Sequence, residues 1–187
     1  MIKSKNSFIF GFGIVKMQIM KQQDTYMIEL NAMLEKAIMR MKIENPGFII
    51  YTASICTDRA AKVSAISFDN KDNSFQNVEK SNDYSRKYYE MYLSEGNFET
   101  ADLFKPKESD RFCNPADFEL ADFVEFNHNF VPSQWYSILV RFGKLAFQKI
   151  ASELNVDQGN FELGINSTKD WYDKKWNMKN FKTGNEI

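Results

Sequence analysis

The stretch GFIIYTASICTDRAAKVSAISFD (residues 47–69) decides how the rest of the chain can fold. It holds two runs rich in β-branched and aromatic residues, separated by the short segment Arg59-Ala60-Ala61. These runs predict two strands joined as a hairpin. The first run carries apolar side chains on both faces, with Ile49, Tyr51, Ala53 and Ile55 on one and Phe48, Ile50 and Cys56 on the other. We therefore expect this strand to lie centrally in a sheet that is covered on both sides.

Amphipathic helices are predicted on both sides of the hairpin. Upstream, apolar residues recur every three or four positions between Asp24, a candidate N-cap, and the helix-ending sequence Asn45-Pro46-Gly47. Downstream, residues 69–83 form a polar connection, and a tyrosine-rich helix then runs to Gly96. The clearest helix opens at Pro132-Ser133 and has one apolar stripe, formed by Trp135, Ile138, Leu139, Phe142, Leu145, Ala146, Ile150 and Leu154.

The C-terminal part supplies the last predicted elements. NFELGI (residues 160–165) predicts a third strand, and STKDWYDKKW (residues 167–176) predicts a short helix capped by Ser167 or Thr168. A hairpin without regular alternation of strand and helix favours the α+β class. We predict a mostly antiparallel sheet packed by a long amphipathic helix and several shorter helices.

Length and composition indicate a single domain. The 187 residues suffice for one core, and we predict that residues 20–187 form it, preceded by an extension of residues 1–19. The apolar run from Phe8 to Val15 is interrupted by glycines, lacks a cleavage pattern, and is far shorter than the roughly 20 residues of a membrane span. The two cysteines, Cys56 and Cys113, form no framework of a secreted module. We therefore predict a cytoplasmic protein that does not contact a membrane.

The middle of the chain is acidic, although the whole chain has a net charge of -1. The segment from Glu95 to Glu125 contains nine carboxylates and three basic residues, which gives it a local charge of -6. This segment would repel a phosphate backbone, so we do not expect nucleic acid as a partner. A solvated acidic face over an aromatic core is the simplest structural interpretation.

Residues 110–129 (DRFCNPADFELADFVEFNHN) gather the only histidine, one cysteine and five carboxylates. A zinc site needs three or four ligands, usually in paired short spacings, whereas His128 stands alone and the cysteines lie 57 positions apart. We predict no metal site and no cofactor. His128 has no accompanying G-x-S-x-G motif, and the acidic neighbours of Cys113 oppose a reactive thiolate, so no catalytic residue is predicted. A surface or half-buried histidine is the expected setting for His128.

The residues Arg111, Pro115, Ala116, Asp117 and Phe118 form a pattern together with FIIYTASICTD, VSAISFDN and FELGINSTKD. This pattern resembles a group of small bacterial α+β domains of unknown function, over roughly residues 25–180. Tryptophan is the more common residue in that group at the position of Phe118. Some bacterial domains of this style serve as immunity proteins in toxin systems, so the resemblance implies such a role. No catalytic residues are attached to the group, and none is carried over.

Two functions from different classes follow from these observations. The first is a binding or inhibitory protein that neutralises a cationic protein, such as a toxin, through an acidic aromatic surface. Its candidate partner-binding residues are Asp110, Asp117, Glu119, Asp122, Glu125, Trp171 and Trp176. The alternative is a carboxylate- or metal-dependent hydrolase that uses the segment from Asp110 to His128. A third interpretation is an oligomeric module that makes contact through the aromatic residues between 171 and 176 and the nearby lysines.

Overall fold

The computed structural model describes residues 6–106, 109 and 111–182, and for residues 6–19, 181 and 182 it describes the backbone only. The fold is α+β with a mostly antiparallel sheet, which confirms the predicted class. The elements in chain order are α1 (Asn6–Glu44), β1 (Thr52–Asp58), β2 (Val63–Asp69), α2 (Lys71–Ser94), α3 (Phe98–Leu103), the 3-10 turn η1 (Pro115–Asp117), β3 (Leu120–Asn127), α4 (Trp135–Glu153), β4 (Glu162–Ile165), β5 (Lys174–Asn177) and α5 (Met178–Lys182).

The sheet has five strands in the order β3-β2-β1-β4-β5, and β1 is the middle strand, as predicted. β1 and β2 form the predicted antiparallel hairpin, in which Ile55 pairs with Ile66. β4 joins β1 in parallel, and the remaining pairings are antiparallel. The strand begins at Thr52, so the alternation predicted for residues 48–51 was wrong: Ile50 is buried in the core, whereas Ile49 is 54% exposed.

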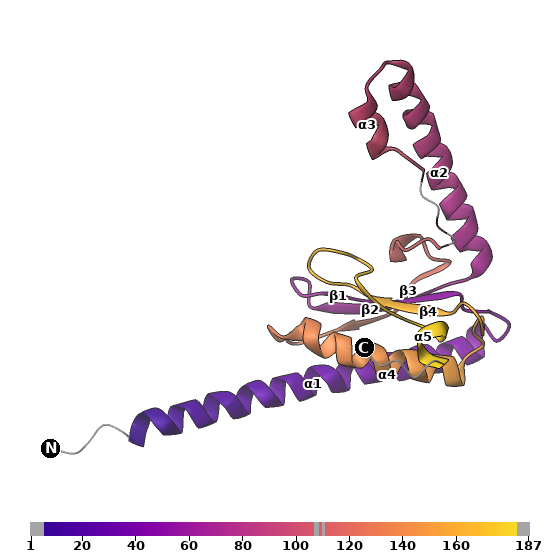
Figure 1. Ribbon diagram of the computed structural model, residues 1–187. Coiled ribbons are helices and arrows are strands. Elements are labelled where there is room, and N and C mark those ends of the chain that lie inside the picture. Colours follow the sequence, from indigo (N-terminus) through magenta and orange to yellow (C-terminus); the bar gives the residue numbers. More distant parts are fainter. Residues whose placement is uncertain (1–5, 107–108, 110, 183–187) are drawn as a thin grey trace.

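One face of the sheet is apolar and is covered by two helices that lie side by side, α1 over β2 and β3 and α4 over β4 and β5 (Figure 1). Their buried stripes meet the inward side chains of the strands, such as Ile55 and Phe68. The rings of Phe147 and Phe161 stack with centroids 5.2 Å apart and planes within 3°. This layer is the hydrophobic core and contributes most of the burial that drives folding.

The opposite face of the sheet, which we call the polar face, is lined by small and polar side chains. Among them are Ser54 and Cys56 of β1, Ser67 of β2 and Gly164 of β4. It is covered by irregular chain, residues 111–119 and 167–173, rather than by helices (Figure 1). β1 is therefore covered on both sides, as predicted, with a different kind of cover on each.

The first helix is longer than predicted. α1 begins at Asn6, so the prediction of an N-cap at Asp24 was wrong. Asp24 lies inside the helix, where an aspartate lowers helix propensity by only a fraction of a kcal/mol, less than ~0.7 kcal/mol. The described backbone of residues 6–19, predicted as an extension, is the first part of the same helix. The end of α1 is as predicted, because Glu44 is its last residue and Pro46 follows.

Residues 71–83 are helical, so the prediction of a polar connection over residues 69–83 was wrong. The side chain of Asn70 caps α2 by accepting a hydrogen bond of 2.8 Å from the Asn73 amide. This part of the helix has solvent on most sides, so it needs no apolar stripe and left no periodic signal in the sequence. The predicted end is confirmed, since Gly96 adopts a left-handed φ of 73° just beyond the helix.

The predicted helix over residues 167–176 was also wrong. The Ser167 hydroxyl accepts hydrogen bonds from the amides of Lys169 and Asp170, which closes a tight turn. Lys174–Asn177 then pair with β4 as the edge strand β5. The edge of β4 offers free backbone N–H and C=O groups, and Lys174–Asn177 form hydrogen bonds with them. This pairing outweighs the local helix propensity.

Replacing Gly164 with alanine should destabilise the fold. A Cβ atom at this position would lie 2.2 Å from the buried Tyr172 ring. The ring must move, so we expect Gly164→Ala to lower the free energy of unfolding by about 1–3 kcal/mol. Gly159→Ala is the matched control, since its nearest atom would be at 3.7 Å. Urea unfolding of both variants measures the difference, and equal stability would contradict the packing of Tyr172 on β4.

Candidate functional site

Four of the predicted acidic residues lie along one edge of the molecule. Asp117 is in η1, Glu119 follows it, and Asp122 and Glu125 belong to β3, which is an edge strand. All four side chains are exposed, and none forms an ion pair with another described residue. Asp110 lies outside the described residues. This edge is therefore an uncompensated acidic surface.

A bulge in β3 sets the direction of these side chains. The register between β2 and β3 shifts between Ile66 and Phe68, and Asp122 adopts a left-handed φ of 45° there. The Asp122 amide donates to the Ser67 hydroxyl at 3.0 Å instead of continuing the regular ladder. Helical geometry in this segment is limited to the single 3-10 turn η1, and Asp122 and Glu125 lie in the strand β3.

The two predicted tryptophans lie on different faces of the sheet. Trp171 is 66% exposed, and its carbonyl lies 3.9 Å from the thiol of Cys56 on the polar face. Cys56 pairs with Ala65, which in turn pairs with Glu125, so Trp171 and Glu125 share this face. Trp176 is half-buried and packs instead against Gly143 of α4. Trp171 therefore shares the polar face with Glu125, whereas Trp176 lies in the core layer.

Arg111, singled out by the family resemblance, fastens residues 111–119 to the sheet. Its guanidinium carbon lies 3.8 Å from the centroid of the Tyr51 ring. Nη1 donates to the Tyr51 carbonyl at 2.7 Å, and Nη2 donates to the Asn160 carbonyl at 2.5 Å. Nε lies 3.6 Å from Oε1 of Glu162 in a buried ion pair. These contacts hold the loop that carries Asp117 in place.

Sequence reasoning missed two residues beside Arg111. Oε1 of Glu162 and the hydroxyl of Tyr172 are buried without a hydrogen-bond partner, and Lys175 Nζ approaches Oε1 at 3.9 Å. Burial, reinforced by the nearby carboxylate of Glu162, raises the pKa of Tyr172 well above its usual value. Glu162 lies in a strand 51 positions after Arg111 and Tyr172 in a loop 61 positions after it, so no local motif connects them to Arg111.

The two thiols are free and unreactive in character. Burial raises the pKa of Cys113, with the Glu162 carboxylate as the next cause, and burial also raises the pKa of Cys56. The direction agrees with the prediction that the surroundings of Cys113 oppose a thiolate, and the main cause is burial. A thiol with a raised pKa holds little thiolate at neutral pH and is a poor nucleophile.

His128 is buried, so the expectation of a surface or half-buried histidine was wrong. Nδ1 lies 2.8 Å from Oε2 of Glu29, and Nε2 lies 2.8 Å from the hydroxyl of Ser64. The chain of hydrogen bonds continues from Ser64 to Thr57 at 2.7 Å and from Thr57 to the Tyr26 hydroxyl at 2.8 Å. The order serine, histidine, carboxylate is that of a catalytic triad.

Burial prevents this triad-like order from acting on a substrate. Ser64 is fully buried, and its hydroxyl is held between His128 and Thr57. A carbonyl substrate would have to reach Ser64 Oγ through α1, whose Tyr26 closes the hydrogen-bond chain. The network therefore ties α1 to the hairpin and satisfies buried polar groups. Its only sequence signal was the single histidine, because Glu29 and Ser64 lie 99 and 64 positions from it.

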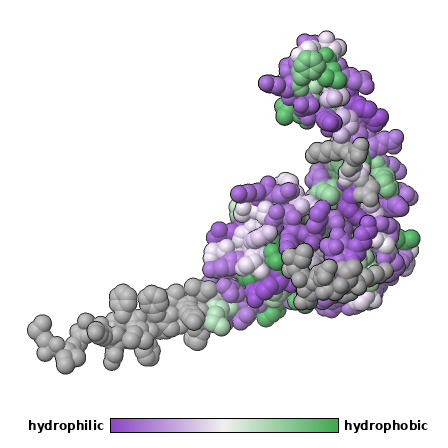
Figure 2. Space-filling view, viewed as in Figure 1, coloured by the Kyte–Doolittle hydropathy of each residue, from purple (hydrophilic) through white to green (hydrophobic). Residues whose placement is uncertain are grey.

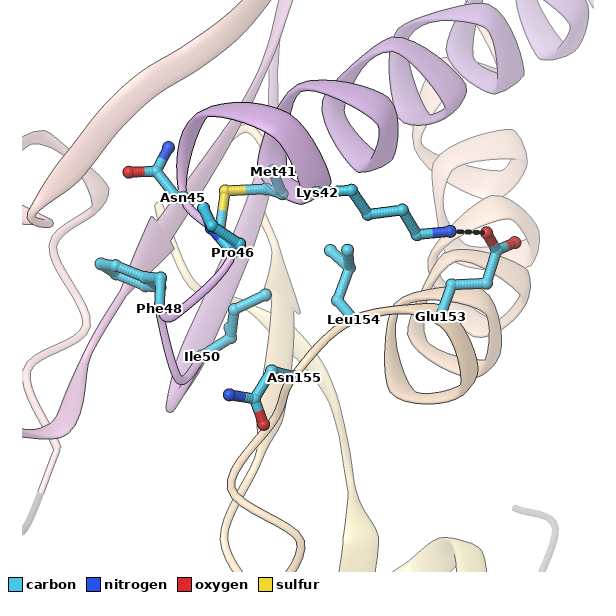
Figure 3. A pocket seen from close by; sticks show the side chains of 9 residues that line it. All are labelled: Met41, Lys42, Asn45, Pro46, Phe48, Ile50, Glu153, Leu154 and Asn155. Atoms are coloured by element: carbon cyan, nitrogen blue, oxygen red, sulfur yellow. Dashed lines mark hydrogen bonds and ion pairs between the residues drawn. The ribbon is translucent and has the colours of Figure 1, made fainter.

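Two of the pockets lined by described residues are large enough to consider as ligand sites. The smaller, of about 170 Å³, lies between the ends of α1 and α4, with apolar Met41, Ile50 and Leu154 and the ion pair of Lys42 with Glu153 at 2.8 Å (Figure 3). The larger, of about 360 Å³, lies at the β1–β2 turn. Its walls include Trp135, Trp171, Asn166, Arg59 and Lys169. Neither holds His128 or the acids of β3.

Within the described part of the chain, no three or more His, Cys, Asp or Glu side chains are grouped so that they could hold a metal ion. Across the same residues, no helix has both the length and the apolar character to span a bilayer. A comparison with protein-family models, curated proteins and solved structures found no match to this chain. The resemblance to bacterial immunity-like domains therefore stays a prediction.

Ser64 should not react as a catalytic serine. We expect a fluorophosphonate probe to leave the native protein unlabelled, because the hydroxyl is enclosed and hydrogen-bonded. Ser64→Ala should lower the free energy of unfolding by about 1–3 kcal/mol, since it leaves buried polar partners unsatisfied. Ser133→Ala, at an exposed position, is the control. Stoichiometric labelling of wild type that Ser64→Ala abolishes would contradict a structural role.

Removing the Arg111 guanidinium should destabilise the fold, because the buried carboxylate of Glu162 then loses a nearby positive charge. We expect Arg111→Met to lower the free energy of unfolding by about 3–5 kcal/mol, because a buried carboxylate loses its main partner. Arg111→Met combined with Glu162→Gln should recover part of that loss. Arg59→Met, at the exposed hairpin turn, serves as the control. Chemical denaturation measures all three, and additive losses in the double variant would count against the ion pair.

Proposed function

We propose that this protein binds and inhibits a basic protein partner through the polar-face edge formed by Asp117, Glu119, Asp122, Glu125 and Trp171. The observation that carries the proposal is the row of four exposed carboxylates along η1 and β3, none of which forms an ion pair with another described residue, on a sheet whose polar face also carries Trp171, which is 66% exposed. Like charges gathered on one edge repel each other, and a basic partner relieves that repulsion. The exposed indole ring supplies an apolar anchor of the kind enriched at binding hot spots.

Electrostatics and rigidity both favour recognition here. An uncompensated acidic edge raises the rate at which a basic partner is encountered and disfavours acidic partners. Asp117 sits on a loop that Arg111 fixes to the sheet, and Asp122 sits on a bulge held by Ser67. A surface that is already ordered loses little conformational entropy on binding.

We further propose that the partner is a toxin and that the protein acts as its immunity protein in the cytoplasm. The support is the sequence resemblance around Arg111 and Pro115–Phe118, together with the acidic edge, which suits a basic enzyme such as a nuclease. The hydrolase alternative has weaker support, because the ring nitrogens of His128 contact Glu29 and Ser64 and not the described acids of the segment, Asp117, Glu119, Asp122 and Glu125.

Neutralising the acidic edge should weaken partner binding. The tagged protein is used to co-purify partners from its native host, with the product of the adjacent gene as the first candidate, and the recovered partner is then purified. We expect the variant Asp117→Asn/Asp122→Asn/Glu125→Gln to bind it at least roughly tenfold more weakly, with a smaller dependence on salt. Asparagine at position 122 also tolerates the left-handed backbone.

The control variant neutralises three exposed acids elsewhere, Asp24→Asn/Glu79→Gln/Asp83→Asn. Its affinity for the partner should stay close to that of wild type in calorimetry. Equal partner affinities for the wild-type protein and for the acidic-edge variant would contradict the proposed binding surface.

A further inference from the structure

A helical arm formed by α2 and α3 projects from the body of the molecule (Figure 1). At its base, Asn73 and Asn77 donate to the Asp117 carbonyl at 2.9 and 3.0 Å. Ser74 is buried there and accepts a hydrogen bond of 2.9 Å from the Phe112 amide. Beyond this base, the extensive packing of α2 is with α3. At 1.5 Å per residue, the 24 residues of α2 extend about 36 Å, so the arm holds its tip far from the sheet.

A stack of aromatic rings gives the outer half of the arm a defined shape. The ring of Phe104 lies 5.4 Å from that of Tyr88 and 5.5 Å from that of Tyr92. The rings of Tyr84 and Tyr88 are 4.6 Å apart. Ring pairs at such distances contribute about 0.5–1.5 kcal/mol each beyond burial of their area. The stack therefore fixes α3 against α2 and orders the tip before any partner arrives.

The tip presents apolar side chains to solvent. Leu103 is 81% exposed and Phe98 is 66% exposed, with Met91 and Leu93 at 38% and 36%. Figure 2 shows hydrophobic atoms at the end of the arm, bordered by hydrophilic ones. Exposed apolar patches with a polar border are typical of interaction sites. An aromatic ring and a leucine on a preformed helical hairpin are suitable anchors for a partner pocket.

Negative charge surrounds this apolar tip. Four exposed carboxylates, Glu90, Glu95, Glu99 and Asp102, lie between residues 88 and 105, against one basic residue, Lys105. None of the four forms an ion pair with another described residue. α2 ends at the tip without a basic residue in its last turn, so the negative end of its dipole adds to the same field. The tip is thus complementary to an apolar residue surrounded by lysine or arginine.

We propose that the tip of the α2–α3 arm is a second docking surface, for a basic protein that covers Phe98 and Leu103 with an apolar contact. The inference rests on the proposed function, because it takes the partner to be the same basic protein. The acidic edge and the arm share a fixed point at Asp117, whose carbonyl holds Asn73 and Asn77. Both surfaces can therefore engage one partner in a fixed relative geometry.

Photocrosslinking locates the partner on the arm. Benzoylphenylalanine at position 98 is compared with the same residue at position 43, which is 72% exposed on α1. The probe is the purified partner from the co-purification. We expect an adduct of one chain with one partner at position 98 and little at position 43. An adduct of two copies of this chain, or no excess over position 43, would overturn the docking surface.

Affinity then tests the chemistry of the contact. Phe98→Ser/Leu103→Ser should weaken binding by at least roughly tenfold, and Ile28→Ser/Ile43→Ser, also at strongly exposed positions, should leave it within about twofold. If the arm variant binds like wild type while the acidic-edge variant loses affinity, the arm surface is overturned and the proposed function stands. If no basic protein binds the wild-type chain, both are overturned.

Discussion

The pairing of β1 with β2 is the constraint on which the rest of the structure depends. Because side chains alternate along a strand, this register sends Ala53, Ile55, Ile66 and Phe68 to one face and Ser54, Cys56, Ser67 and Asp69 to the other. The first face requires apolar cover, which α1 and α4 provide. The second face is buried yet polar, so it requires hydrogen-bonding cover, which irregular chain supplies more easily than a helix does. A shift of the β1–β2 register by one residue would send the apolar side chains of the shifted strand to the polar face and its polar side chains to the core.

Buried polar groups are handled differently on the two sides. On the helical side, the path from Tyr26 through Thr57, Ser64 and His128 to Glu29 gives every member a partner and ends near solvent. On the polar side, burial raises the pKa of Asp69 despite hydrogen bonds from Asn73 and the Glu119 amide. Its other oxygen has no hydrogen-bond partner, and neither has Glu162 Oε1, which is compensated only by the more distant charges of Arg111 and Lys175. The polar side therefore carries polar groups that lack a hydrogen bond, close to the loops that bear the acidic edge.

The acidic segment of the sequence is divided by the fold into two surfaces. The arm carries Glu95, Glu99 and Asp102. The sheet edge carries Asp117, Glu119, Asp122 and Glu125. The same segment thus supplies negative charge at two places: around the exposed Phe98 on the arm, and along β3, whose Glu125 shares the polar face with the exposed Trp171. Such a division allows recognition at two points by one continuous stretch of chain, and it follows from the helical hairpin inserted between β2 and β3.

The sequence by itself determined the features that depend on neighbours along the chain. The hairpin, the end of α1 at Pro46 and the stop at Gly96 follow from side-chain periodicity and from the backbone limits of proline and glycine. The predicted apolar stripe of α4 is also buried, or half-buried at Leu154, except for Leu145, which is 52% exposed. The sequence also located the acidic segment and Trp171, because the charge and the aromatic character of a residue do not depend on its contacts in the fold. The start of α2 and the helical state of residues 6–23 gave no periodic signal.

Only the tertiary structure decided which distant residues meet. His128 finds Glu29 and Ser64 through the packing of α1 on β2, and Arg111 finds Glu162 through the parallel pairing of β4 with β1. The strand β5 forms where a helix was predicted, because the open edge of β4 offers backbone partners that local propensity does not include. These contacts are set by burial and by the need to satisfy buried polar groups, and both are properties of the assembled chain.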